Sequence, residues 1–192
     1  MKIVTIVFYL LKIIHLLIKK IMKWQNNLFL NMKKIILQLN IILIMKEKIT
    51  IYTDGACSGN PGKGGWAAVI IEDENEKTIS GSEMLTTNNR MELLAVIKAL
   101  EIIKQEADIV IYTDSTYVQK GITEWIHSWK RNQWKNSSKK IIKNIDLWQR
   151  LDELTSGHSI EWLWVKGHAG HDGNEKADQL ANQGVDNLLK GL

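Results

Sequence analysis

The stretches KITIYTD, residues 48–54, and DIVIYTD, residues 108–114, end two apolar runs on the same four letters. Both runs are rich in β-branched residues and have the length of one strand. If these strands are parallel neighbours, they lie about 4.8 Å apart. Asp54 and Asp114 would then lie at one edge of the sheet, where open α/β folds bind their ligands.

The rest of the domain alternates between strand and helix patterns. Further strands are expected at 66–72, 77–85 and 159–165, and helices at 86–105, in three or four pieces across 115–156, and from about 173 to 189. Helical spacing and period-two alternation of apolar residues carry these predictions. They favour the α/β class, with a five-stranded mixed sheet flanked by helices. No linker interrupts residues 47–192, which we interpret as one domain.

The glycine-rich stretch GACSGNPGKGGW, residues 55–66, raises the question of a nucleotide-binding loop. It lacks the Walker pattern, because Gly64 follows Lys63 where Ser or Thr is required. The dinucleotide pattern matches loosely at 62–67, but a helix should follow and 66–72 has a strand pattern. We interpret the stretch as a wide glycine-rich hairpin whose backbone can approach a phosphodiester.

The first 46 residues differ in composition from the rest. They hold eight lysines and no acidic residue, and they lack Gly, Ala, Pro, Ser, Arg and Cys. Residues encoded by AT-rich codons favour a start codon assigned too early, with Met45 as the true start. A membrane anchor stays open, since 3–18 is nearly all apolar, but the run is short and Lys12 and His15 interrupt it. A signal peptide is the third interpretation, although no small-residue cleavage site follows.

The net charge of +4 comes from this extension. Residues 47–192 carry 17 Lys and Arg against all 21 Asp and Glu. Nucleic-acid binding by this domain must therefore depend on a local basic patch. Cys57 is the single cysteine, which excludes an internal disulfide and a cysteine-based zinc site and fits a reduced cytoplasmic thiol.

Asp54 and Asp114 are the first candidates for a metal site. Two neighbouring carboxylates repel, and a divalent cation between them would relieve that repulsion. Carboxylate oxygens without cysteine or a histidine cluster suit Mg²⁺ or Mn²⁺ rather than zinc. The simpler alternative is that each aspartate is a turn residue after its strand and that Asp114-Ser115 caps the next helix.

Three further candidates are weaker when each is taken singly. Glu92 either forms a capping box with Asn89 or points from the first turn of its helix at the two aspartates. Asp178 lies on a partly buried helix stripe and by itself fits a solvated helix acid. His168 lies in a glycine-flanked loop, where a mobile imidazole beside carboxylates suits proton transfer, whereas His171 is expected at the surface.

The stretch WIHSWKRNQWKNSSKKIIKNI, residues 125–145, is basic and rich in tryptophan. No acidic residue lies between Glu124 and Asp146. Cations beside flat aromatic rings are typical of surfaces that bind a nucleic-acid backbone. We expect a helical protrusion that binds nucleic acid, with some of its tryptophans packed as core anchors.

The chain resembles bacterial type 1 ribonuclease H in five segments: YTDGACSGNPGKGGW, TTNNRMELLAVIKALE, TDSTYVQKGITEWIHSWKRNQWK, NIDLWQRLD and WVKGHAGHDGNEKAD. The resemblance covers residues 48 to about 184. It implies a ribonuclease H-like sheet with its first three strands antiparallel and its first, fourth and fifth strands parallel. It also implies a monomeric cytoplasmic endonuclease that cuts the RNA strand of an RNA–DNA hybrid, leaving 5′-phosphate and 3′-hydroxyl ends.

The same resemblance implies roles for individual residues. The metal ligands would be Asp54, Glu92, Asp114 and Asp178, and His168 would be the family's flexible catalytic histidine. Substrate contacts would come from Cys57, Asn60, Thr87, Asn88, Asn89, Thr116, Trp125, Trp129, Lys130, Arg131, Lys135, Lys139 and Lys140. Thr116 departs from the glutamine of the best-known bacterial members, which puts one contact to an RNA 2′-hydroxyl in doubt.

The implied chemistry uses two Mg²⁺ ions about 4 Å apart, one activating water and the other stabilising the leaving 3′ oxygen, with Mn²⁺ as an alternative. Selectivity would need a 2′-hydroxyl on one strand and DNA-like phosphate spacing on the other. A non-catalytic nucleic-acid-binding module on the same fold is the alternative. A membrane-tethered nuclease is a third hypothesis that depends wholly on residues 1–46.

Overall fold

The computed structural model describes residues 2–44 and 48–191. Its contacts divide the chain into two units, residues 1–46 and residues 47–192. The first unit contains one helix, α1 (Lys2–Ile44). Within the described residues, no helix combines the length and the apolar character needed to cross a membrane.

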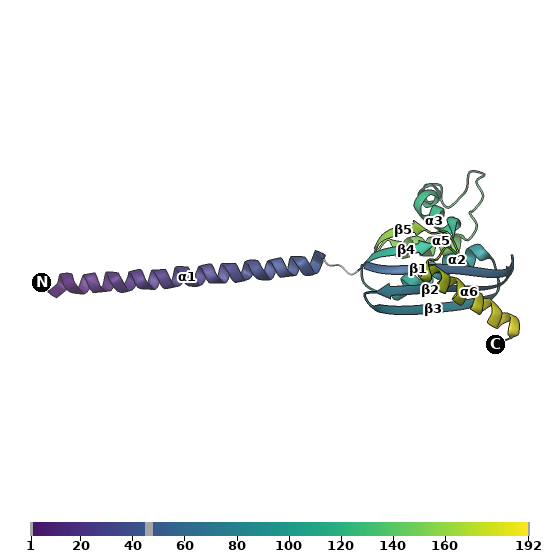
Figure 1. Ribbon diagram of the computed structural model, residues 1–192. Helices are drawn as coiled ribbons and strands as arrows, with labels where there is room; N and C mark the ends of the chain where they lie inside the picture. The colour runs from purple at the N-terminus through teal and green to yellow at the C-terminus, as the bar shows by residue number, and fades with distance from the viewer. Residues whose placement is uncertain (1, 45–47, 192) are drawn as a thin grey trace. The chain divides into compact units, whose positions relative to one another are not determined.

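The second unit is built on a five-stranded sheet with the order β3-β2-β1-β4-β5 (Figure 1). Its strands are β1 (Lys48–Gly59), β2 (Gly62–Glu72), β3 (Asn75–Thr86), β4 (Asp108–Thr113) and β5 (Ser159–Trp164). The pairs β1–β2 and β2–β3 are antiparallel, whereas β1–β4 and β4–β5 are parallel. The prediction of a mixed five-stranded sheet is confirmed.

The two copies of the repeated IYTD sequence, at the ends of the paired parts of β1 and β4, are neighbours in the structure. In the parallel register, Ile51, Tyr52 and Thr53 pair with Ile111, Tyr112 and Thr113. The two tyrosine rings stack, with centroids 4.8 Å apart and planes inclined by 15°. A slip of one residue would move every side chain of one strand to the opposite face. This register therefore brings the two following aspartates to the same place.

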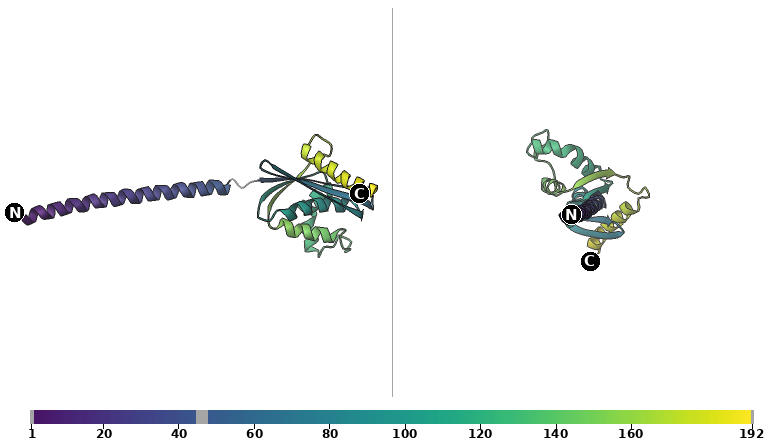
Figure 2. Two further views of the ribbon diagram at one scale, coloured as in Figure 1. Left: turned by 90° about the horizontal axis from the view of Figure 1, so that it is seen from below. Right: turned by 90° about the vertical axis from the view of Figure 1, so that its left-hand side faces the viewer.

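Helices cover both faces of the sheet (Figure 2). On one face lie α2 (Asn88–Ile102) and α5 (Ile145–Thr155), whose buried side chains form the main core with β1 and β4. On the other lies α6 (Asp172–Lys190), which contacts β1, β2 and β3. Alternate residues of a strand point to opposite faces, so β1 contributes to both layers.

The glycine-rich stretch forms the predicted hairpin between β1 and β2, but the hairpin is tight and not wide. β1 continues to Gly59 and β2 begins at Gly62, which leaves a turn of two residues. The glycines are needed for close packing: a Cβ on Gly65 would come within 2.1 Å of the Ala181 carbonyl oxygen of α6. The composition indicated a flexible loop. In the structure, a glycine without a side chain lets a helix pack closely against the sheet.

The basic stretch is helical only in its first part. It follows α3 (Thr116–Lys120) and comprises the end of a π-helical turn, η1 (Gly121–Trp125), and then α4 (Ile126–Arg131). Residues 132–144 form turns, closed by an antiparallel bridge between Lys135 and Ile141. The prediction of a helical protrusion is therefore wrong beyond Arg131, and a loop carries most of the cations.

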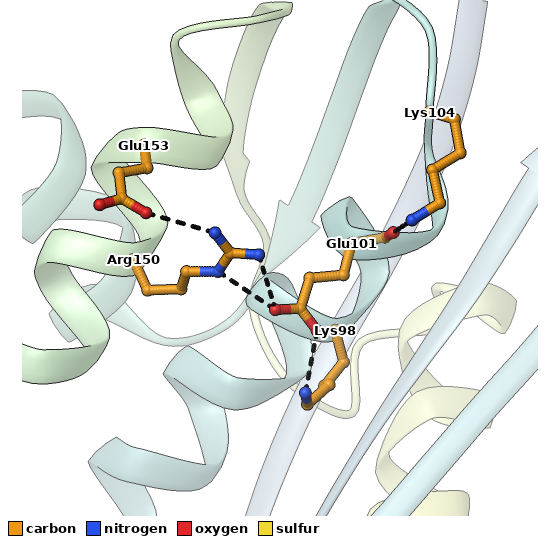
Figure 3. A network of polar contacts seen from close by, with 5 residues as sticks. All are labelled: Lys98, Glu101, Lys104, Arg150 and Glu153. Carbon is orange, nitrogen blue, oxygen red and sulfur yellow. Dashed lines mark hydrogen bonds and ion pairs between the residues drawn. The ribbon is translucent and has the colours of Figure 1, made fainter.

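A surface network links α2 to α5 (Figure 3). Glu101 accepts from Lys98 at 2.9 Å and from Arg150 at 3.2 and 3.1 Å, and Arg150 also binds Glu153 at 3.2 Å. Lys104 binds the main-chain oxygen of Glu101 at 2.8 Å. Lys98, followed by Arg150, holds the pKa of Glu101 below its ordinary value. Exposed ion pairs stabilise weakly one by one, but this network fixes the end of α2 against α5.

Candidate metal centre and nucleic-acid interface

Three carboxylates from different elements converge at the end of β4. Asp54 lies in β1, Glu92 in α2 and Asp114 directly after β4, and one oxygen of each lies within 4.8 Å of the others. Asp54 and Glu92 are buried, whereas Asp114 is partly exposed. Asp54 does not end its strand as expected, because β1 continues beyond it. It marks instead the point where the pairing of β1 with β4 stops.

Glycine beside Asp54 lets α2 bring Glu92 into the cluster. A Cβ on Gly55 would lie 2.3 Å from the main-chain nitrogen of Glu92, a separation that real Cβ atoms do not have. The first turn of α2 is also fixed to α5, because Arg90 binds both carboxylate oxygens of Asp146 at 3.1 and 2.9 Å. The position of Glu92 is therefore set by packing on both sides of its helix.

Glu92 does not cap its helix, so the prediction of a capping box is wrong. The N-cap is Thr87, and Asn89 is the second helical residue. Glu92 Oε1 accepts from Asn88 Nδ2 at 3.4 Å, while Oε2 is buried without a hydrogen-bond partner among the described residues. An unpaired buried oxygen is unfavourable, which makes Glu92 Oε2 available to a cation.

Asp114 is held from several sides while its carboxylate stays in the cluster. Trp164 Nε1 donates to the Asp114 main-chain oxygen at 2.9 Å. A Cβ on Gly167 would lie 2.6 Å from Asp114 Oδ2, so the loop after β5 passes directly over the carboxylate. Ser115, not Asp114, caps α3 by accepting from the Val118 nitrogen at 3.3 Å. The capping alternative thus falls on the neighbouring serine.

Asn174 is a site residue that the sequence interpretation missed. It is 2% exposed, and its Nδ2 donates to Asp114 Oδ2 at 3.4 Å. Its Oδ1 is buried and has no partner among the described residues. Asn174 precedes Asp178 by four positions, one helical turn on the same face of α6. This spacing could have indicated from the sequence that Asn174 lies near the carboxylates.

Asp178 lies beside Asp54, and His168 lies at the rim. The pKa of Asp54 is raised by burial and by the charge of Asp114, and the charge of the neighbouring Asp178 raises it further. Asn182 Nδ2 donates to Asp178 Oδ1 at 2.8 Å. His168 Nδ1 is 3.9 Å from Asp178 Oδ2, and the imidazole is 79% exposed. The structure thus brings Asp54, Glu92 and Asp114 together, places Asp178 next to Asp54, and leaves the histidine open to solvent.

Burial and mutual repulsion decide the protonation of this cluster. Burial, followed by the charges of Asp114 and Asp178, raises the pKa of Asp54 to about 7. Burial, followed by Asp54 and Asp114, raises the pKa of Glu92 well above its ordinary value. A divalent cation would compensate these charges, and hard oxygen ligands suit such an ion. The residues therefore fit a metal site.

Several expected substrate contacts lie on one edge next to Glu92. Cys57 is in β1, and its Sγ lies 3.7 Å from the Thr86 main-chain oxygen. Thr86 ends β3 and pairs with Gly62, so the glycine-rich hairpin that carries Asn60 adjoins the start of α2. Thr87, Asn88 and Asn89 begin that helix, whereas Thr116 is an exposed residue at the start of α3.

The expected tryptophan contacts belong to an aromatic cluster. Tyr117, Trp125, Trp129 and Trp148 form a chain of tilted and edge-to-face pairs with centroids 5.2–6.3 Å apart. Trp148 is fully buried, while Trp125 is 36% exposed. Tyr117 Oη accepts from Trp148 Nε1 at 3.0 Å. The cluster thus anchors the basic segment and presents Trp125 at the surface.

The loop after α4 presents cations around a hollow. The hollow has a volume of about 360 Å³ and is lined by Arg131, Asn132, Gln133, Lys135, Asn136, Ser137 and Lys139. Lys140 is an exposed neighbour in the same loop. Lys130 is engaged elsewhere, because its ammonium lies 2.8 Å from an oxygen of Asp152 in α5. The basic loop, residues 132–140, is therefore the better candidate for phosphate contacts, together with Arg131 at the end of α4.

Comparison with known proteins gives consistent matches. A family model described as RNase H matches residues 46–186. A protein from Nitrosospira multiformis named Ribonuclease H is 56% identical over 148 residues, covering 77% of this chain and 96% of the relative. LC9-RNase H1, a type 1 RNase H with the type 2 active-site motif, has a TM-score of 0.67 at 35% identity, covering 73% of each chain. The foamy viral protease–reverse transcriptase in complex with RNA/DNA hybrid has a TM-score of 0.62 at 25% identity, covering 74% of this chain and 20% of the viral one.

Proposed function

Because the chain belongs to the ribonuclease H family, we propose that it hydrolyses the RNA strand of RNA–DNA hybrids and leaves 5′-phosphate and 3′-hydroxyl ends. The observation that carries this proposal is the convergence of Asp54, Glu92 and Asp114, with Asp178 beside them. A binding module without catalysis would not need four crowded carboxylates, two of which are buried.

The four carboxylates would hold Mg²⁺, with Mn²⁺ as an alternative. Two such ions, bound with the substrate, would supply an activated water and stabilise the leaving 3′ oxygen. Glu92 Oε2 is a buried acceptor with no partner among the described residues, and it would become a ligand. His168 would exchange a proton with solvent or assist product departure, because its imidazole is exposed next to Asp178.

Substrate binding would use both sides of the carboxylate cluster. On the edge that carries Cys57, the side chains of Asn60, Asn88 and Asn89 would contact the minor groove and the RNA 2′-hydroxyls, and Thr87 would contact a phosphate of the DNA strand. Trp125 and the basic loop would contact the DNA strand, since exposed cations beside a flat ring suit a phosphodiester backbone. One similar structure was solved with an RNA/DNA hybrid, which supports this substrate class. We propose a monomer that acts in the cytoplasm.

The test compares the full chain with Asp54→Asn on a labelled RNA–DNA hybrid. Mg²⁺-dependent cleavage should fall to background in the variant, while hybrid binding measured without divalent cations should be preserved. Asp186→Asn is the matched control, because Asp186 is an exposed carboxylate on α6 and not part of the cluster. Cleavage by Asp54→Asn at the rate of the control would refute the proposed metal role. A wild-type chain that binds hybrid and never cuts it would favour the non-catalytic module.

A further inference from the structure

The lysines of α1 lie on one side of the helix. Between Lys12 and Leu37, the lysines are Lys12, Lys19, Lys20, Lys23, Lys33 and Lys34, and all are exposed. At 3.6 residues per turn they fall within an arc of about 140°. Residues 1–46 contain no acidic residue that could neutralise them. The helix therefore carries its lysines on one side, with Leu16, Leu30 and Leu37 among them.

The opposite side of α1 is apolar and open to solvent. It is formed by Ile14, Leu17, Ile18, Ile21, Met22, Trp24, Leu28, Phe29, Met32, Ile35 and Ile36. Their exposed fractions run from 47% for Leu28 to 66% for Trp24, and Gln25 is the one polar residue between them. An apolar surface of this extent marks a site of interaction in a folded protein.

Charge decides between the occupants that could cover this face. A nucleic-acid backbone would neutralise the lysines but leave the apolar face in water. A second copy of α1 would cover the apolar face but would leave the lysines of both helices without an anionic partner, because residues 1–46 contain no acidic residue. A bilayer surface with anionic lipids meets both needs, because acyl chains take the apolar side chains and phosphate groups take the lysines.

Two side chains at the border between the lysine side and the apolar side of α1 suit the surface of a bilayer. Lys33 Nζ lies over the Phe29 ring, 4.6 Å from its centroid, so a cation–π contact joins the lysine side of the helix to the apolar side. Trp24 lies at the border between the two faces, where an indole can contact both acyl chains and headgroups. Leu16, Leu30 and Leu37 fall within the lysine arc, and they provide internal controls.

We propose that α1 lies along the surface of a bilayer that contains anionic phospholipids and holds residues 47–192 close to it. This interaction is independent of the activity proposed for the carboxylate cluster. It differs from the anchor considered from the sequence, because the helix lies in the plane of the interface and does not cross the bilayer.

The experiment is flotation of the full chain with vesicles of phosphatidylcholine alone or mixed with phosphatidylglycerol. Binding should be at least about tenfold stronger to the anionic vesicles and should weaken in high salt. Leu28→Gln, on the apolar face, should weaken binding several-fold. Leu30→Gln makes the same chemical change within the lysine arc and should bind like the wild type. Near-ultraviolet circular dichroism confirms that residues 47–192 remain folded in both variants.

Four results would overturn the inference. The first two are no flotation with either vesicle and equal flotation with neutral and anionic vesicles. The third is an equal loss of binding in Leu28→Gln and Leu30→Gln. The fourth is release of the chain from anionic vesicles when RNA–DNA hybrid is added, which would show that α1 binds the hybrid instead. The native N-terminus gives an independent test by mass spectrometry of the protein from its own cells. The proposal requires peptides from residues 1–44, whereas a chain that begins at Met45, as the composition favours, would overturn it.

Discussion

Asn174 of α6 donates a hydrogen bond to Asp114 Oδ2 at 3.4 Å, across the gap between the last helix and the end of β4. This contact orients the Asp114 carboxylate, although Asn174 is itself uncharged. We expect Asn174→Ala to weaken Mg²⁺ binding about tenfold, as loss of a residue that orients a metal ligand does. Calorimetric titration with Mg²⁺ measures this, and kcat should fall while KM for the hybrid changes little.

Asn187→Ala is the control for this variant, because Asn187 is an exposed asparagine on the same helix. It should leave both the Mg²⁺ affinity and kcat unchanged. Equal Mg²⁺ affinities for Asn174→Ala and the wild type would show that Asn174 only fills space.

The pKa of Asp54 predicts how stability depends on pH in the absence of divalent cations. The folded-state pKa is about 7, above the unfolded value, so the folded state holds a proton that the unfolded state has released. The free energy of unfolding should therefore fall as pH rises from about 4 to about 7, and stay low above that. Asp54→Asn removes the contribution of this group to the pH dependence and should stabilise the protein at about pH 8 by about 4 kcal/mol.

Urea unfolding in the presence of a chelator measures the effect at about pH 5.5 and about pH 8. The difference between the wild type and Asp54→Asn reports the titration of Asp54 together with its effect on Glu92, whose pKa the Asp54 charge also raises. A wild type whose stability relative to the variant does not change with pH would contradict the raised pKa. Saturating Mg²⁺ should stabilise the wild type more at the higher pH, because the ion binds the ionised cluster.

Gly55→Ala should separate α2 from β1. The added Cβ would lie 2.3 Å from the main-chain nitrogen of Glu92. Overpacking of this kind costs about 1–3 kcal/mol, and the displaced Glu92 should also lower the Mg²⁺ affinity. Gly157→Ala is the matched control, since nothing lies within 4 Å of the Cβ it would add. Thermal unfolding compares the two variants, and equal melting temperatures would exclude the proposed close contact.

Lys135→Ala combined with Lys139→Ala should weaken hybrid binding without changing the chemistry. Both residues line the hollow of the basic loop. KM should rise several-fold, kcat should be unchanged, and the slope of log affinity against log salt should fall by about one for each phosphate that the loop no longer binds. Lys77→Ala is the control, because it removes an exposed lysine of β3 far along the chain from the loop. A salt slope that does not change in the double variant would exclude this loop as a phosphate-binding surface.

Local patterns in the sequence identified the sheet and the cluster with good accuracy. Period-two alternation predicted the strands. The repeated IYTD indicated that Asp54 and Asp114 lie next to each other at one edge of the sheet. Predictions failed where the local sequence suggests one role for a residue and its contacts with distant segments give it another. Glycines that suggest a loop let α2 and α6 approach the sheet, and Glu92, which matches a capping box, is buried in the cluster.

The sequence by itself determined the strand and helix order, the repeated carboxylate positions and the lysine content of α1. Each of these depends on residue type and on spacing along the chain, which the sequence contains directly. Only the tertiary structure decided the Tyr52–Tyr112 register, the contact of Asn174 with Asp114 and the raised pKa of Asp54. Those features depend on how closely distant segments approach and how far water is excluded, and packing fixes both.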